Sequence, residues 1–135
     1  MKRAPQVLIA DRSQLMQQWL AAAVRGAFGT VDATCVSSGT ELLHHIADCG
    51  PYDLVVSHAM LPEISGGQVL AMVRTANLNT PFIVLSYVPS AALTRMVNRV
   101  GHADLVDDPL DAAAVRAAAR QLVASNGSCA CQACA

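Results

Sequence analysis

His58 stands where a functional side chain is expected in this sequence. It follows residues 54–56, a short continuous apolar run that is bounded by Pro51 and Pro62. Such a run is typical of a parallel strand that is covered on both faces. In open α/β sheets, ligands and chemistry lie just past the carboxyl ends of the strands. The pattern therefore predicts that the imidazole of His58 lies at a functional edge of a sheet.

Other polar side chains follow the neighbouring predicted strands. Asp11 and Arg12 come directly after the first predicted strand. Ser86 ends the fourth, and Asp108 follows the fifth. Because strand ends converge at one edge, we predict that Arg12 and Asp108 pair there, with His58 nearby. Carboxylates beside an imidazole favour its protonated form, so Asp11 and Asp108 are expected to keep His58 charged.

Alternating strand and helix patterns indicate the fold class. Apolar runs predict strands at residues 6–10, 30–36, 53–57, 82–86 and 104–107. The segments after them carry apolar residues at helical spacing, and the last predicted helix runs from Asp111 to about Ser125. Strands that alternate with helices form parallel βαβ units with right-handed crossovers. The predicted fold is therefore α/β, with a doubly wound, five-stranded parallel sheet.

Length and composition predict one domain and exclude several classes of protein. The 135 residues suit a single domain over residues 1–125, followed by a flexible, Cys-containing tail over residues 126–135. No stretch of about 18 apolar residues is free of charges or helix breakers, and no signal-peptide core follows the first methionine. We therefore expect a cytoplasmic protein. The net charge of −1 gives no reason to expect binding to nucleic acid or to a membrane.

The sequence around His58 resembles the phosphorylation-site segment of response-regulator receiver domains. The matching motifs are Met-Leu-Pro at residues 60–62 and Ser-Gly at residues 65–66, after an apolar strand. The resemblance extends over residues 6–123, and it implies the flavodoxin-like receiver fold with strand order 2-1-3-4-5. In the family, the phosphate-accepting aspartate lies four residues before the proline. This chain has His58 at that position.

The resemblance also implies where the other site residues of a receiver should lie. Receivers use two acids that hold Mg²⁺, a Ser or Thr that contacts the phosphoryl group, and a Lys that neutralises it. Asp11 and Ser86 keep this pattern, whereas Arg12 replaces the second acid, His58 the aspartate and Asp108 the lysine. A guanidinium repels a divalent cation, so Mg²⁺ binding is expected to be lost and no other cofactor is expected. Each residue also has a purely structural interpretation, such as helix capping by Asp11.

These departures predict a degenerate receiver in two-component phosphorelay signalling. We expect a phosphorylation-independent protein-interaction module rather than an enzyme, with a sensor kinase or a downstream regulator as its partner. One alternative is a residual phospho-carrier at Asp11 or His58. Another is a redox- or metal-sensing adaptor that uses Cys129, Cys131 and Cys134, although zinc usually takes four ligands and these cysteines could equally be incidental.

The predicted partner surface is the face of the fourth helix, the fifth strand and the fifth helix, where receivers commonly dimerise or dock. The fourth helix carries Arg95 and Arg99, and the fifth carries Arg116 and Arg120. Each pair has i, i+4 spacing and is expected on one side of its helix. Together with nearby aspartates, such a surface would suit a two-fold homodimer. The alternative is two ordinary solvated helix faces.

Overall fold

Strands and helices alternate along the part of the chain that the computed structural model describes, residues 4–87, 90–107 and 111–134, with side chains as far as residue 124. The strands are β1 (Gln6–Ala10), β2 (Asp32–Val36), β3 (Leu54–His58), β4 (Phe82–Leu85) and β5 (Ala103–Val106). The helices are α1 (Gln14–Phe28), α2 (Gly39–Asp48), α3 (Gly66–Thr75), α4 (Ala91–Val100) and α5 (Ala112–Cys134).

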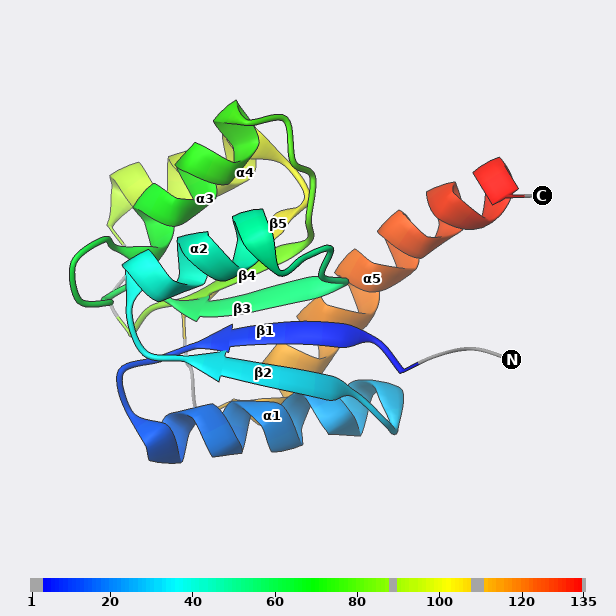
Figure 1. Ribbon diagram of the computed structural model, residues 1–135, viewed down its shortest axis with the longest axis horizontal. Coiled ribbons are helices and arrows are strands. Elements are labelled where there is room, and N and C mark those ends of the chain that lie inside the picture. Colours follow the sequence, from blue (N-terminus) through cyan, green and yellow to red (C-terminus); the bar gives the residue numbers. More distant parts are fainter. Residues whose placement is uncertain (1–3, 88–89, 108–110, 135) are drawn as a thin grey trace.

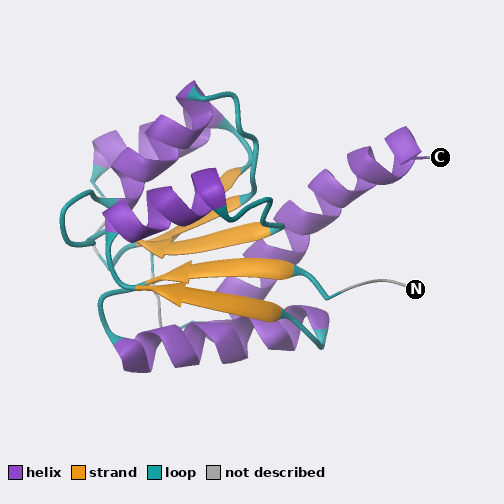
Figure 2. Ribbon diagram, viewed as in Figure 1, coloured by secondary structure: helices purple, strands orange, loops and turns teal. Residues whose placement is uncertain are grey.

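All strands pair in parallel, in the order β2-β1-β3-β4-β5, which confirms the predicted fold and strand order. Helices α1 and α5 cover one face of the sheet, and α2, α3 and α4 cover the other (Figures 1 and 2). The carboxyl ends of the strands therefore meet at one edge. The first loop after β1 and the loops after β3 and β4 all lie at this edge, so they bring distant residues together.

Two apolar layers hold the sheet between its helices. Val7 and Ile9 of β1 point into the layer that contains α1 and α5, whereas Leu8 and Ala10 point into the layer that contains α2 and α3. This alternation follows from the period of two along a strand. Each such side chain that is fully buried contributes about 1.5–3 kcal/mol. A strand that is buried on both faces explains why residues 54–56 form an unbroken apolar run.

A tight loop between β3 and α3 holds the end of β3 in place at the carboxyl edge of the sheet. Ser65 caps α3 and forms a capping box with Gln68. The backbone N–H of Gly66 donates to the carbonyl of Ala59 at 3.0 Å. A Cβ on Gly66 would collide with the backbone oxygen of His58. The glycine of the Ser-Gly motif is thus required for the close approach of α3 to the end of β3.

The C-terminal end of α5 differs from the predicted one, and the C-terminal end of α1 is marked by a glycine. Helix α1 passes through Gly26 and ends at Phe28, where Gly29 with a φ of 82° is its C-cap. Helix α5 continues to Cys134 rather than ending near Ser125. The added residues contain no proline, and one helical glycine costs only about 1 kcal/mol, which does not suffice to end a helix. None of the described helices is long and apolar enough to cross a membrane.

Candidate functional site at the carboxyl ends of β1 and β3

The structure brings three of the predicted site residues to one pocket at the carboxyl edge of the sheet. Asp11 and Arg12 reach it from the loop after β1, and His58 reaches it from the end of β3. The pocket has a volume of about 240 Å³. Its lining residues are Asp11, Arg12, Met16, His58, Met60 and Tyr87. The methionines and the tyrosine make most of its wall apolar.

Asp11 is the buried acid of this pocket, since only 3% of its surface is exposed. Its Oδ1 accepts a hydrogen bond from the backbone N–H of Ser13 at 2.9 Å. Its Oδ2 is buried and has no hydrogen-bond partner among the described residues. The N-cap of α1 is Ser13, whose hydroxyl accepts from the backbone N–H of Met16, so the helix-capping role that was considered for Asp11 belongs to Ser13. Asp11 instead holds the turn that leads into α1, and half of its carboxyl group is left unsatisfied.

His58 is held by its own loop rather than by an acid. The backbone N–H of Met60 donates to Nδ1 of His58 at 2.9 Å. This hydrogen bond needs the lone pair of Nδ1, so the neutral ring carries its proton on Nε2. The predicted effect of Asp11 and Asp108 on the charge of His58 stays a prediction, because Asp108 lies outside the described residues. The ring of Tyr87 lies 6.1 Å away and is tilted by 54°.

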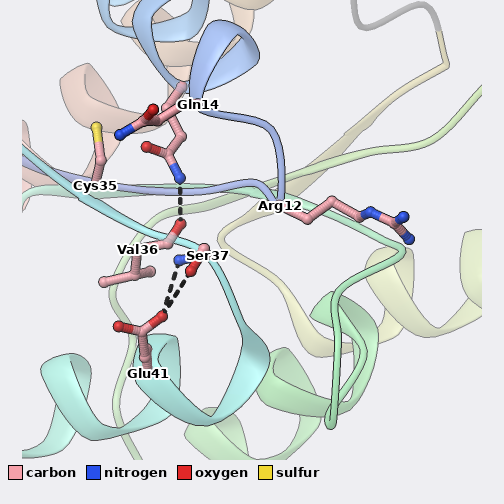
Figure 3. Close-up of a pocket in the computed structure, with 7 residues that line it drawn as sticks. Arg12, Gln14, Cys35, Val36, Ser37 and Glu41 are labelled. Carbon is pink, nitrogen blue, oxygen red and sulfur yellow. Dashed lines mark hydrogen bonds between the residues drawn. The ribbon is translucent and has the colours of Figure 1, made fainter.

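Arg12 is exposed and makes no ion pair with a described residue. It lies between the pocket of Asp11 and a second pocket of about 410 Å³, between the N-terminal ends of α1 and α2. Figure 3 shows its side chain pointing away from the other labelled residues of that second pocket. Asp108, its predicted partner, lies outside the described residues, so the predicted Arg12–Asp108 pair stays a prediction.

The second pocket is lined by groups that already satisfy one another (Figure 3). The side-chain amide of Gln17 donates to the carbonyls of Asp11 and Val36 at 2.7 and 3.1 Å. The carboxylate of Glu41 accepts from the backbone N–H and the hydroxyl of Ser37, and these hydrogen bonds lower the pKa of Glu41. These hydrogen bonds anchor the loops after β1 and β2 to α1 and α2, so we do not interpret this pocket as a ligand-binding site.

Cys35 also lines the second pocket, and burial raises the pKa of its thiol, although the nearby Arg25 opposes this. A raised thiol pKa lowers the fraction of reactive thiolate. No group of three or more His, Cys, Asp or Glu side chains that could hold a metal ion occurs in the described part of the chain. The side chains of Cys129, Cys131 and Cys134 lie outside that part, so the predicted Cys-based metal or redox site is untested.

Ser86, the remaining predicted site residue, is buried directly after β4. Its backbone N–H donates to the carbonyl of Val106 at 3.0 Å and continues the pairing of β4 with β5. It is not one of the residues that line the pocket of Asp11. The next residue, Tyr87, does line that pocket and is 56% exposed. The strand-end position of Ser86 is thus as predicted, whereas the side chain that faces His58 is its neighbour.

The predicted partner surface needs a correction at helix α5. Arg120 donates to the backbone carbonyls of Gly26 and Ala27 at 3.2 and 3.3 Å, at the end of α1. Arg116 lies against Gly26, where an added Cβ would be 2.8 Å from the Cδ of the arginine. Both arginines are therefore directed to α1 and not across the face of α4, β5 and α5. Arg120 satisfies carbonyls that the end of α1 leaves without partners.

Arg95 and Arg99 are exposed on α4, as their predicted role requires. The sequence interpretation missed Met16, Met60 and Tyr87, the apolar wall of the pocket. Met60 and Tyr87 carried a usable signal, because they closely follow the ends of β3 and β4, whereas Met16 lies within α1.

The fold, and the position of these residues at the carboxyl edge of the sheet, place this chain among the doubly wound α/β proteins. The sequence model of the response regulator receiver domain matches residues 7–120. The chain therefore belongs to the family of response-regulator receiver domains, which act in two-component signalling.

Three known proteins illustrate the similarity. The receiver domain of Francisella response regulator 1452 is 27% identical with a TM-score of 0.79, over 90% of this chain and 98% of that one. A receiver domain of a putative LuxO repressor protein from Vibrio parahaemolyticus shares the fold, with 20% identity, a TM-score of 0.80 and coverage of 91% and 92%. The transcriptional regulatory protein CusR of Escherichia coli K12 is 37% identical over 43 residues, which are 32% of this chain and 19% of CusR.

Proposed function

We propose that this chain is a degenerate receiver that binds a protein partner without being phosphorylated. The observation that carries the proposal is the side chain at the end of β3. His58 occupies the position from which a receiver's aspartate would attack, and its Nδ1 is engaged by the backbone of Met60. An imidazole in that place supplies no carboxylate for a metal ion or for an acyl phosphate.

The rest of the pocket supports the same proposal. Arg12 follows Asp11 and lines the same pocket, so a divalent cation next to Asp11 would meet a guanidinium. We therefore propose that Mg²⁺ does not bind here, that no other cofactor is needed, and that the chain is not an enzyme.

A phospho-carrier at His58 is the weaker alternative. Its Nδ1 accepts the hydrogen bond from Met60, and the neutral ring then carries its proton on Nε2. Neither nitrogen offers a free lone pair for attack on a phosphorus atom unless that hydrogen bond breaks. Asp11 is also a poor acceptor, because it is almost fully buried and its Oδ1 accepts a hydrogen bond from the backbone N–H of Ser13.

The proposed partner is a sensor kinase or a downstream regulator. Receivers serve between such proteins, and CusR, which this chain matches over only 19% of the CusR length, is named a transcriptional regulatory protein. The face of α4 with Arg95 and Arg99 remains a proposed docking surface, and self-association through it is part of the same proposal.

Beryllofluoride tests the proposal directly, because it mimics a phosphoryl group on a receiver aspartate only when Mg²⁺ and the aspartate are present. We expect the amide NMR spectrum of the full chain to stay unchanged when Mg²⁺ and beryllofluoride are added together. A conventional receiver in the same buffer provides the control. Mg²⁺-dependent shifts of amides around Asp11 and His58 would refute the proposal.

A further inference from the structure

The unsatisfied oxygen of Asp11 indicates that its pocket is incomplete. Asp11 is 3% exposed, and its Oδ2 has no hydrogen-bond partner among the described residues. A buried acceptor without a donor costs about 1–3 kcal/mol, and more when it is charged. Such groups call for an explanation in a folded protein. Asp11 also lines a pocket that opens at the surface, so a donor can come from outside the chain.

The walls of this pocket define the shape of a suitable donor group. Met16, Met60 and Tyr87 line it and offer apolar surface around the carboxyl group. Met60 and Tyr87 are 69% and 56% exposed, and Leu15, next to Met16 at the start of α1, is 76% exposed. Exposed apolar side chains grouped around a pocket are typical of a protein-binding site. A fitting ligand therefore has an apolar stem and a cationic donor at its tip.

We propose that the pocket receives the side chain of a lysine from the partner protein, with its ammonium group on Asp11 Oδ2. The proposal rests on the proposed function, because it names the chemistry by which the partner is recognised. The four methylene groups of lysine can pack against the thioethers of Met16 and Met60, as long cationic side chains commonly do. The rings of His58 and Tyr87 provide aromatic surface beside the stem.

Charge and geometry favour lysine over the other donors. Oδ1 already accepts from the backbone N–H of Ser13 and only Oδ2 is left without a donor, so the site needs one compact donor rather than the two parallel hydrogen bonds of a guanidinium. An ammonium group is a compact point charge and needs only one oxygen. A bare divalent cation would require several oxygen ligands, and the pocket offers Asp11 as its only carboxylate among the described residues.

The methylene chain of the lysine can enter only if the side chains at the mouth of the pocket move. Oδ2 is itself buried, and the exposed side chains of Arg12 and Met60 line the same pocket. Both side chains are long and unbranched and can change rotamer at low cost. At the same distance the guanidinium of Arg12 repels a singly charged ammonium group half as strongly as a divalent cation, and rotation of Arg12 away from Asp11 lowers this repulsion further.

A ligand titration of the full chain tests this inference. The probe is Nα-acetyl-lysine methylamide, followed by the NMR signals of the methionine methyl groups and of backbone amides. The comparison probes are the norleucine derivative, which has the stem without the charge, and Mg²⁺ alone. We expect saturable shifts at Met16 and Met60 with the lysine derivative only. Asp11→Asn should weaken binding at least about tenfold, because it removes the charge and keeps the shape.

Two further variants control for folding and for net charge. Asp48→Asn removes the same charge from an exposed position on α2, where Asp48 pairs with His44 at 3.1 Å, and it should leave binding unchanged. Met60→Ala removes part of the apolar wall at an exposed position and should weaken binding even if Asp11→Asn fails to fold. Equal shifts with the norleucine derivative, shifts with Mg²⁺ alone, or no shifts at any soluble concentration would each overturn the inference.

The outcome is independent of the test of the proposed function. No phosphoryl donor or analogue is present in this titration, so absence of lysine binding leaves the degenerate receiver intact. Conversely, beryllofluoride-induced shifts would refute the phosphorylation-independent function without changing the result of the lysine titration.

Discussion

At the scale of single residues, two side chains decide what the site edge can do. The end of β3 and the position of His58 were predictable, because an apolar run and a proline mark them in the sequence. The hydrogen bond from Met60 to Nδ1 was not, because it depends on the backbone path of the loop after β3. The missing hydrogen-bond partner of Asp11 Oδ2 could not be predicted either, because it depends on how the side chains around the pocket pack.

A first prediction concerns the cost of the buried carboxylate. Asp11→Asn should raise the free energy of unfolding by about 1 kcal/mol, because a neutral amide is less costly to bury than a charged group. Its Oδ1 can still accept from the N–H of Ser13. Urea denaturation of the purified chain measures this. A loss of stability on this substitution would show that the carboxylate has a cationic partner within the chain.

At the scale of elements, an arginine at the end of α3 joins two loops, the one between α3 and β4 and the one between α4 and β5. Arg74 donates to the backbone carbonyls of Leu78, Thr80, Gly101 and His102, at 2.7–3.2 Å. Burial lowers the pKa of its guanidinium. The sequence showed only a basic residue in the last turn of a helix. Its contacts to residues that are 27 and 28 positions away depend on the fold and could not be predicted from local patterns.

A second prediction follows from this contact set. Arg74→Met keeps the stem and leaves these carbonyls without their donor, so it should lower the free energy of unfolding by about 2–3 kcal/mol. Arg74→Lys should restore only part of this, because one ammonium group cannot reproduce the planar fork of a guanidinium. Thermal and urea unfolding of both variants test this. Equal stability of Arg74→Met and the wild type would show that solvent replaces these hydrogen bonds without cost.

A third prediction uses two glycines as a matched pair. In Gly66→Ala the new methyl group meets the backbone oxygen of His58, which cannot move without distorting the site, so we expect a loss of at least about 2 kcal/mol. In Gly26→Ala it meets only the flexible side chain of Arg116, and the gain in helix propensity of up to about 1 kcal/mol should dominate. Urea unfolding of the two variants should therefore give effects of opposite sign.

At the scale of the whole molecule, the sheet order and the two helical layers were predictable, because alternating βα units restrict the topology strongly. The direction in which the arginine side chains point from their helices was not predictable. The i, i+4 spacing of Arg116 and Arg120 showed that they share a side of α5, but not that this side faces α1. Helix rotation is set by packing, which the spacing of charges alone does not reveal.

A fourth prediction tests the remaining part of the proposed partner surface. Arg95→Glu with Arg99→Glu reverses the exposed charge of α4 and should weaken self-association or partner binding. Stability should change by no more than about 0.5 kcal/mol, because exposed substitutions away from special contacts have small effects. Sedimentation at several concentrations measures the self-association. A double variant that sediments and binds a partner as the wild type does would exclude this face of α4 as the interface.

Intact mass spectrometry after incubation with acetyl phosphate and Mg²⁺ tests the central claim most directly. His58 at the end of β3 and Arg12 beside Asp11 leave no complete phosphorylation site among the described residues. We predict that the mass of the chain stays unchanged under conditions in which a conventional receiver is labelled. A Mg²⁺-dependent phosphoryl adduct on Asp11 or His58 would contradict the account.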